Sequence, residues 1–281
     1  MKQGLDKAVE GEAVCLNYRS AGQADQPALL LIHGWGGSSR YFQAAMQRLS
    51  PAFYCLAPDL PGFGETPPLA VCDEATLSQC YSHRGLARLV GRWLKAQQVS
   101  QCDVIGHSYG AGVAIALAAS QPVRVRRVVL SNFSTFRNER ERRMVVFAHH
   151  VTSLLTSLRQ WRIARSDAFA RLLGARFFHK LPDLAVLREG LEDFWRMDPR
   201  AAEWTVRSSL GWETHDDLRA LTQPVLLIHS HHDQIMPPRN AEYTARLPRS
   251  GRLVWLDRCG HLPMVECPDQ FVAIVRDFLL Q

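Results

Sequence analysis

The sequence contains no run of about 18 consecutive apolar residues, the length that a membrane-spanning helix requires, so it predicts no such helix. Residues 1–7 lack the apolar core of a secretory signal. The seven cysteines form no C-x-x-C pair, a pattern that favours free thiols in a reducing compartment. We therefore expect a cytoplasmic protein.

Motifs that bind phosphate, dinucleotides or metals are also missing. There is no G-x-x-x-x-G-K-[ST] and no G-x-G-x-x-G, so we expect no cofactor. His231 and His232 are adjacent, but no second cluster with ligand spacing accompanies them, so we expect no metal. The net charge of +6 comes from basic residues that alternate with acidic ones, and no recognition motif is present, which argues against nucleic-acid binding.

What the sequence does contain is an alternation of short apolar runs with amphipathic segments. Its 281 residues, 47% of them hydrophobic, can form one α/β domain with an inserted subdomain. Strands are expected at 12–19, 28–32, 53–57, 104–105, 125–130, 224–229 and 252–256, and helices at 41–49, 84–97, 111–116, 241–247 and 270–280. This alternation implies a mostly parallel, doubly wound sheet with helices on both faces.

The alternation stops between about Ser134 and Asp217, in a segment of helical character that is rich in aromatic residues and arginine. We expect an α/β core of residues 1–133 and 218–281, with a helical lid of residues 134–217 inserted after the strand at 125–130. The apolar side chains of the lid would build an apolar pocket over the site. Its arginines would either steer an acidic partner, such as an acyl carrier protein or a CoA thioester, or form a solvated helix face interspersed with acids.

A candidate nucleophile lies at residues 106–110, which read Gly-His-Ser-Tyr-Gly between an apolar run and a small-residue helix. A serine on such a sharp strand-to-helix turn adopts strained backbone geometry and presents its hydroxyl above the sheet edge. Glycines on either side let the strand and the helix approach closely. This context predicts that Ser108 is a catalytic nucleophile.

A serine nucleophile needs a base, and the base needs an orienting carboxylate. Asp233 comes just after the strand at 224–229, and His261 lies in the loop after the next strand. Both therefore fall at the carboxyl edge of the sheet, where catalytic groups of open α/β sheets gather. We predict His261 as the base and Asp233 as the acid, with Asp257 as a rival acid.

Two backbone donors are expected for the oxyanion. The strand at 28–32 is followed by a Gly-rich loop, residues 33–39, whose freed N–H groups can turn inward. We predict the N–H groups of Trp35 and Tyr109 as the oxyanion hole, where loss of one donor typically costs about 10²–10³ in rate. The side chains at these two positions are expected to shape the acyl pocket.

Taken together, these motifs make the sequence similar to α/β-hydrolase-fold proteins, in the branch of lid-bearing serine esterases and hydrolases. The resemblance covers nearly the whole chain and rests on residues 33–37, 58–64 and 106–110, on Asp233 before Pro237, and on Gly260-His261. It implies the same nucleophile, base, acid and backbone donors, and a structural role for Asp59. Dehalogenases and epoxide hydrolases of this family carry an aspartate where this chain has Ser108, so both activities are disfavoured.

The function predicted is that of a serine hydrolase that cleaves a small-molecule carboxylic ester, with an apolar acyl or alcohol group, through an acyl-enzyme. Alternatives remain open. The same residues would serve a thioesterase or acyltransferase acting on CoA- or carrier-bound acyl groups, or a carbon–carbon bond hydrolase. A ligand receptor that keeps the fold and turns over slowly is a further alternative.

Overall fold

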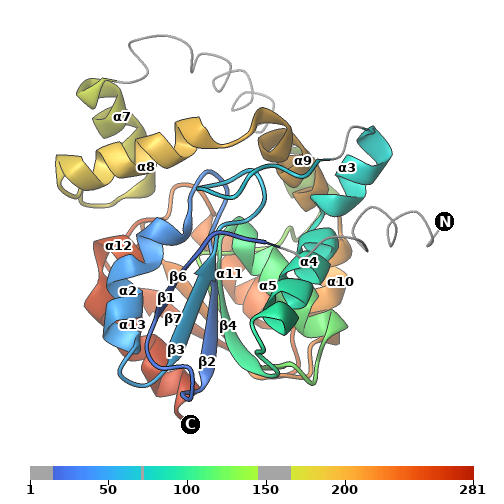
Figure 1. The fold of residues 1–281 in the computed structure, drawn as a ribbon. Coiled ribbons are helices and arrows are strands. Elements are labelled where there is room, and N and C mark those ends of the chain that lie inside the picture. The colour runs from blue at the N-terminus through green and yellow to red at the C-terminus, as the bar shows by residue number, and fades with distance from the viewer. Residues whose placement is uncertain (1–14, 71–72, 145–165) are drawn as a thin grey trace.

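The computed structural model describes residues 15–70, 73–144 and 166–281, which include a seven-stranded sheet (Figure 1). The strand order is β1-β3-β2-β4-β5-β6-β7, with β1 antiparallel to β3 and all other neighbouring strands parallel. The strands are β1 Tyr18–Ala21, β2 Ala28–Ile32, β3 Tyr54–Pro58, β4 Cys102–His107, β5 Val125–Ser131, β6 Val225–Ser230 and β7 Gly251–Leu256. The predicted fold class is confirmed.

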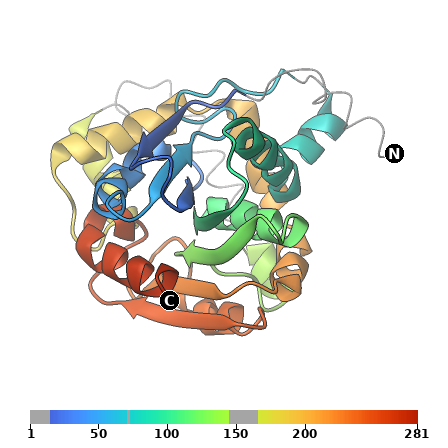
Figure 2. The same ribbon diagram turned by 60° about the horizontal axis from the view of Figure 1, so that its bottom comes forward.

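Helices cover both faces of this sheet (Figures 1 and 2). Alternate residues of one strand point to opposite faces, so Leu30 packs among α4 (His83–Ala96) and α5 (Tyr109–Ser120), while Leu29 packs among α2 (Gln43–Leu49) and α13 (Pro268–Leu279). Because both faces are covered, β4 and β6 are buried along their whole length. The sheet edge at which the parallel strands end carries the loops that form the site.

Most predicted elements fall within a few residues of their observed bounds. The predicted strand at 12–19 lies partly outside the described residues, and β1 is observed only over Tyr18–Ala21. The predicted helix at 41–49 is a 3₁₀ turn, η1 (Ser39–Phe42), followed by α2. Helix α3 (Glu74–Cys80) was not predicted, although Asp73 caps it by accepting a hydrogen bond from the Thr76 N–H.

Between β5 and β6 lie the inserted helices, a name used here for α7 (Asp167–Phe177), α8 (Leu184–Arg196) and α9 (Pro199–Ser209). They lie above the strand ends (Figure 1). The next helix, α10 (Glu213–Ala220), buries Leu218 in the core beside α5. This helix spans residue 217, the predicted boundary between lid and core. The division into core and lid therefore remains a prediction.

Three short elements complete the description: η4 (Pro238–Asn240), α11 (Ala241–Ala245) and α12 (Pro263–Glu266). Among the residues that the structure describes, no helix is long and apolar enough to cross a membrane.

Candidate active site

The turn between β4 and α5 places Ser108 at the carboxyl edge of the sheet. Its backbone has φ +50° and ψ −118°, which is unusual for a residue with a side chain, and its N–H donates a 2.9 Å hydrogen bond to the Ser131 carbonyl. A Cβ at Gly106 would collide with the backbone of Ala111, and one at Gly110 with the carbonyl of His33. Only glycine fits at either position, as the strand–turn–helix motif requires.

His261 and Asp233 form a buried pair at the same edge. Nδ1 of His261 lies 2.8 Å from Oδ2 of Asp233, and the two side chains are 4% and 0% exposed. The rival acid, Asp257, is 89% exposed and lies 3.5 Å from Nε2 of His231 instead. Of the two candidate acids, the structure therefore brings Asp233 to His261.

Four donors surround the Asp233 carboxylate. Oδ1 accepts the backbone N–H groups of Ile235 (2.8 Å) and Met236 (2.9 Å), and Oδ2 accepts Nδ2 of Asn132 (2.8 Å) besides His261. Burial opposes ionisation of this carboxyl, but the charge of His261 and these hydrogen bonds outweigh burial and hold the pKa of Asp233 well below its usual range. Asp233 is therefore a fixed negative charge behind the imidazole.

Asn132, directly after β5, was not singled out from the sequence. Its Nδ2 also lies 3.1 Å from the Gly260 carbonyl, so this one amide ties the Asp233 loop to the loop that carries His261. The available signal was its position: Asn132 directly follows β5, which lies between β4 and β6, so its side chain can reach the same sheet edge.

Ser108 and His261 line one cavity of about 400 Å³. The ring of His107 packs against that of His261, with centroids 4.8 Å apart. The wall opposite the sheet is largely apolar and comes from α7 and α8; it includes Leu173, Phe177, Val186, Leu187, Leu191 and Phe194. The cavity thus combines the predicted nucleophile and base with an apolar binding surface.

Of the two residues predicted to supply oxyanion donors, Tyr109 follows Ser108 directly and Trp35 lines the same cavity as Ser108. Trp35 lines the cavity, its ring packs against Phe194 with centroids 5.8 Å apart, and its Nε1 donates to the Ala202 carbonyl at 3.0 Å. Among the backbone hydrogen bonds of turns and loops in the described residues, none has the Trp35 or the Tyr109 N–H as its donor. The Tyr109 side chain was expected to shape the pocket, but its hydroxyl instead donates to the buried carbonyl of Tyr81. Its ring packs against His83, with centroids 4.6 Å apart, and does not line the cavity.

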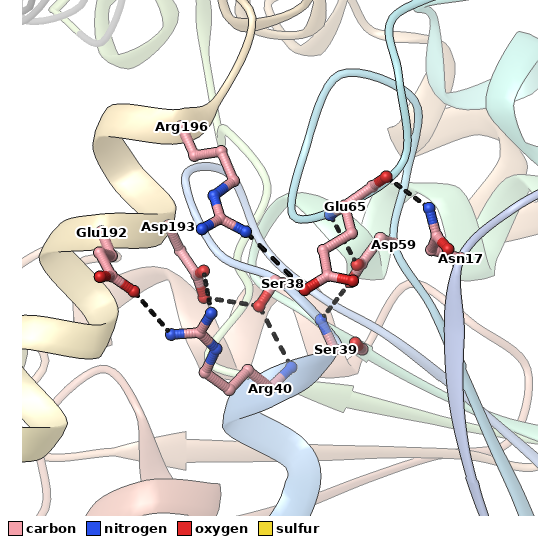
Figure 3. Close-up of polar contacts among 9 residues, drawn as sticks. All are labelled: Asn17, Ser38, Ser39, Arg40, Asp59, Glu65, Glu192, Asp193 and Arg196. Atoms are coloured by element: carbon pink, nitrogen blue, oxygen red, sulfur yellow. Dashed lines mark hydrogen bonds and ion pairs between the residues drawn. The ribbon is translucent and has the colours of Figure 1, made fainter.

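Two carboxylates hold the Gly-rich loop in place (Figure 3). Oδ1 of Asp59 accepts the Ser39 N–H at 2.7 Å and its Oδ2 accepts the Glu65 N–H at 3.0 Å, in keeping with the structural role expected for Asp59. From α8, Oδ2 of Asp193 accepts the Ser38 hydroxyl at 2.5 Å, and Oδ1 lies 3.5 Å from the Arg40 guanidinium.

Asp193 is buried at this junction, and sequence reasoning missed its role. Burial raises the pKa of its carboxyl above the usual range, although the Ser38 hydrogen bond and the Arg40 charge oppose the shift. Arg40 also pairs with Glu192 at 3.3 Å, so the first turn after the Gly-rich loop is bound to α8 at two points.

A second junction joins the His261 loop to the end of α7. One Glu266 carboxylate accepts the backbone N–H groups of Gly260 (2.7 Å), His179 (3.2 Å) and Lys180 (2.6 Å). The His261 N–H donates to the Phe177 carbonyl at 2.6 Å. Sequence reasoning did not identify Glu266, yet it fixes the backbone on which the predicted base is carried.

The adjacent histidines make aromatic contacts. His231 stacks on Trp255 with ring centroids 4.5 Å apart, and His232 stacks on His179 at 4.0 Å. Among the described residues, no three His, Cys, Asp or Glu side chains cluster as metal ligands.

Comparison with known proteins gives the family of this chain. Residues 29–274 match the alpha/beta hydrolase family. A pimeloyl-[acyl-carrier protein] methyl ester esterase from Neisseria meningitidis serogroup B is 28% identical over 251 residues, 89% of this chain and 91% of the relative. A 2-hydroxymuconate semialdehyde hydrolase from Pseudomonas putida is 31% identical over 266 residues, 90% and 86% of the two chains.

Solved structures share the fold. A thermophilic esterase from Thermogutta terrifontis superposes with a TM-score of 0.76 at 20% identity, over 94% of this chain and 92% of the esterase. The predictions of the fold and of a hydrolytic enzyme are confirmed, and the chain belongs to the alpha/beta hydrolase family.

Proposed function

We propose that this hydrolase cleaves carboxylic esters through an acyl-enzyme on Ser108, with His261 as the base and Asp233 as the orienting acid. The observation that carries the proposal is the buried His261–Asp233 pair, whose imidazole lines the same cavity as the strained Ser108 turn. Such an arrangement activates a hydroxyl that is otherwise a poor nucleophile at neutral pH.

In the proposed reaction, Ser108 Oγ attacks the ester carbonyl while His261 Nε2 accepts its proton. The N–H groups of Trp35 and Tyr109 stabilise the oxyanion. His261 then protonates the departing alcohol, and the bond from the carbonyl carbon to the alcohol oxygen breaks. Water, deprotonated by His261, attacks the acyl-enzyme and releases the acid and free Ser108. Throughout, Asp233 holds the imidazole tautomer and stabilises its cation.

The substrate that fits this cavity has an apolar acyl or alcohol group. Most of the residues that α7 and α8 contribute to the cavity wall are apolar, and burial contributes about 25 cal/mol per Å² of apolar surface. We propose that the inserted helices act as a lid over Ser108 within the predicted segment 134–217, of which residues 145–165 lie outside the described structure. We also propose that the protein works in a reducing cytoplasm.

A second candidate substrate is an ester borne by an acyl carrier protein or CoA. The pimeloyl-carrier esterase relative supports it. Four described arginines of the segment favour the solvated-face alternative instead, because Arg137 pairs with Glu141, Arg142 and Arg143 pair with Glu139, and Arg188 pairs with Asp167. Three more arginines of the segment, Arg159, Arg162 and Arg165, lie outside the described residues. A carbon–carbon bond hydrolase is the third candidate, supported by the 2-hydroxymuconate semialdehyde hydrolase relative.

The test is turnover of short- and medium-chain p-nitrophenyl esters and acyl-CoA thioesters, with covalent labelling by a fluorophosphonate. We expect ester turnover and a label on Ser108, and Ser108→Ala should lose several orders of magnitude in kcat while remaining folded. Ser120→Ala, at the far end of α5, is the matched control and should keep wild-type turnover. Activity of Ser108→Ala within about tenfold of wild type would refute the assignment of the nucleophile.

A further inference from the structure

Two cysteine thiols meet at the base of the loop that carries His261. Cys259 follows β7, and Cys267 lies between α12 and α13. Their Sγ atoms are 2.7 Å apart. Non-bonded heavy atoms normally rest at about 3.5–4.0 Å, and this separation is only about 0.7 Å longer than a disulfide bond of ~2.05 Å. The two side chains therefore already hold their sulfurs nearly at bonding distance.

The two thiols differ in access. Cys259 is buried, whereas Cys267 is partly exposed. Hydrogen bonding to Cys267 and burial raise the pKa of the Cys259 thiol, which keeps that thiol protonated. A dissolved oxidant thus reaches Cys267 first, with Cys259 directly behind it as the resolving thiol.

The other described cysteines lack this arrangement. Cys55, Cys80 and Cys102 are buried, so a dissolved oxidant does not reach them directly, and Cys15 is exposed. Among the described cysteines, Cys259 and Cys267 are the one pair in contact.

We propose that Cys259 and Cys267 are a redox-modification site, which closes to an intramolecular disulfide when the protein meets a low-molecular-weight disulfide such as oxidised glutathione. The Cys267 thiolate attacks one sulfur of the oxidant, forms a mixed disulfide and releases one glutathione thiolate. The Cys259 thiol, as it loses its proton, then attacks the Cys267 sulfur and expels the second glutathione. The two protein sulfurs are oxidised by two electrons, and one oxidised glutathione becomes two reduced molecules.

The disulfide would hold the His261 loop in its present conformation rather than distort it. Glu266, beside Cys267, already binds the Gly260 N–H next to Cys259, so both ends of the span 259–267 are held together before oxidation. A cross-link of this kind mainly constrains the unfolded chain, and a loop of this size predicts a rise in Tm of about 5 °C. Since the loop need not move, kcat/KM for an ester should stay within about twofold.

The chain offers a direct assay. Trypsin cleaves after Arg258 and next after Arg276, so both cysteines fall in one peptide that contains no other cysteine. The reduced full-length protein is incubated with oxidised glutathione, blocked with iodoacetamide under denaturing conditions, digested and analysed by mass spectrometry. The expected peptide is two hydrogens lighter than the dithiol form and carries no alkyl group. Dithiothreitol should reverse this change and lower Tm again.

Three variants make the test specific. Cys15→Ser should still form the bridge, as a matched exposed-cysteine control. Cys267→Ser should leave Cys259 open to alkylation, and Cys259→Ser should stop at a glutathione adduct on Cys267; neither variant should gain Tm on oxidation. A wild-type peptide that remains doubly alkylated, or that carries glutathione without a bridge, overturns the proposal. A bridged protein whose Tm does not rise overturns the role in holding the His261 loop.

Discussion

Replacing Asp233 with asparagine tests the predicted acid most sharply, because the geometry dictates how the new amide must lie. Oδ1 faces two backbone donors, the N–H groups of Ile235 and Met236. The amide oxygen of the variant should occupy that position, since the opposite orientation would set an NH₂ group against two backbone donors, whereas this one sets it against a single side-chain donor, Nδ2 of Asn132. The NH₂ group therefore replaces Oδ2 and faces Nδ1 of His261.

An NH₂ group at that position can only donate, so Nδ1 of His261 becomes the acceptor and the ring proton moves to Nε2. The nitrogen that should accept the Ser108 proton is then blocked. Stabilisation of the imidazolium is lost as well, because the buried negative charge has gone. Loss of the correct tautomer and of this charge lowers kcat by about 10⁴ in a Ser-His-Asp triad.

The assay is steady-state hydrolysis of a p-nitrophenyl ester near neutral pH, with circular dichroism to verify folding. Asp257→Asn is the matched control: this carboxylate is exposed and pairs with His231, so turnover should stay within about twofold of wild type. If Asp257→Asn is the more damaging change, or if Asp233→Asn retains activity within about tenfold, the assignment of Asp233 is refuted.

Three further predictions concern stability and coupling. The pKa of Asp233 in the folded protein lies below the unfolded value of about 3.9, so the stability that Asp233 contributes is present above that pH and is lost on further acidification. In urea titrations, the free energies of unfolding of the wild type and of Asp233→Asn should therefore converge in acid. The raised pKa of Asp193 has the opposite sign, so Asp193→Asn should gain stability relative to wild type as pH rises from 4 to 8. Glu266→Ala should lose about 1–3 kcal/mol of stability, measured by urea denaturation, and its kcat should fall several-fold. Glu266→Gln should lie between Glu266→Ala and the wild type in both measurements. Equal kcat in all three proteins would exclude a positioning role for Glu266.

The parts of the molecule that could be predicted from sequence are those that local chemistry determines. Residues 28–32 are apolar on both faces and became β2 at the predicted bounds. The turn at Ser108 is specified by its own glycines, and His261 and Asp233 follow from the rule that strand ends share one edge. Periodicity and motif spacing suffice for such features.

What could not be predicted are the contacts between distant segments. Asp193 reaches Ser38 across 155 positions of sequence, and Asn132 reaches Asp233 across 101. In the sequence, Asp193 is one acid among several on an amphipathic helix, and nothing local distinguishes it from the exposed Glu192 beside it. Which carboxylate turns inward depends on how α8 docks, a property of the packed structure.

These distant contacts have a common consequence for specificity. α8 supplies apolar cavity wall and, through Asp193, restrains the loop that carries the Trp35 N–H. The end of α7 supplies Phe177 to the same wall and, through Glu266, restrains the loop that carries His261. The surface that selects the substrate is thus built on the helices that position the reacting groups. A change of wall volume that shifts either helix will therefore alter kcat together with KM, because a displacement of about 1 Å is enough to misalign a catalytic group.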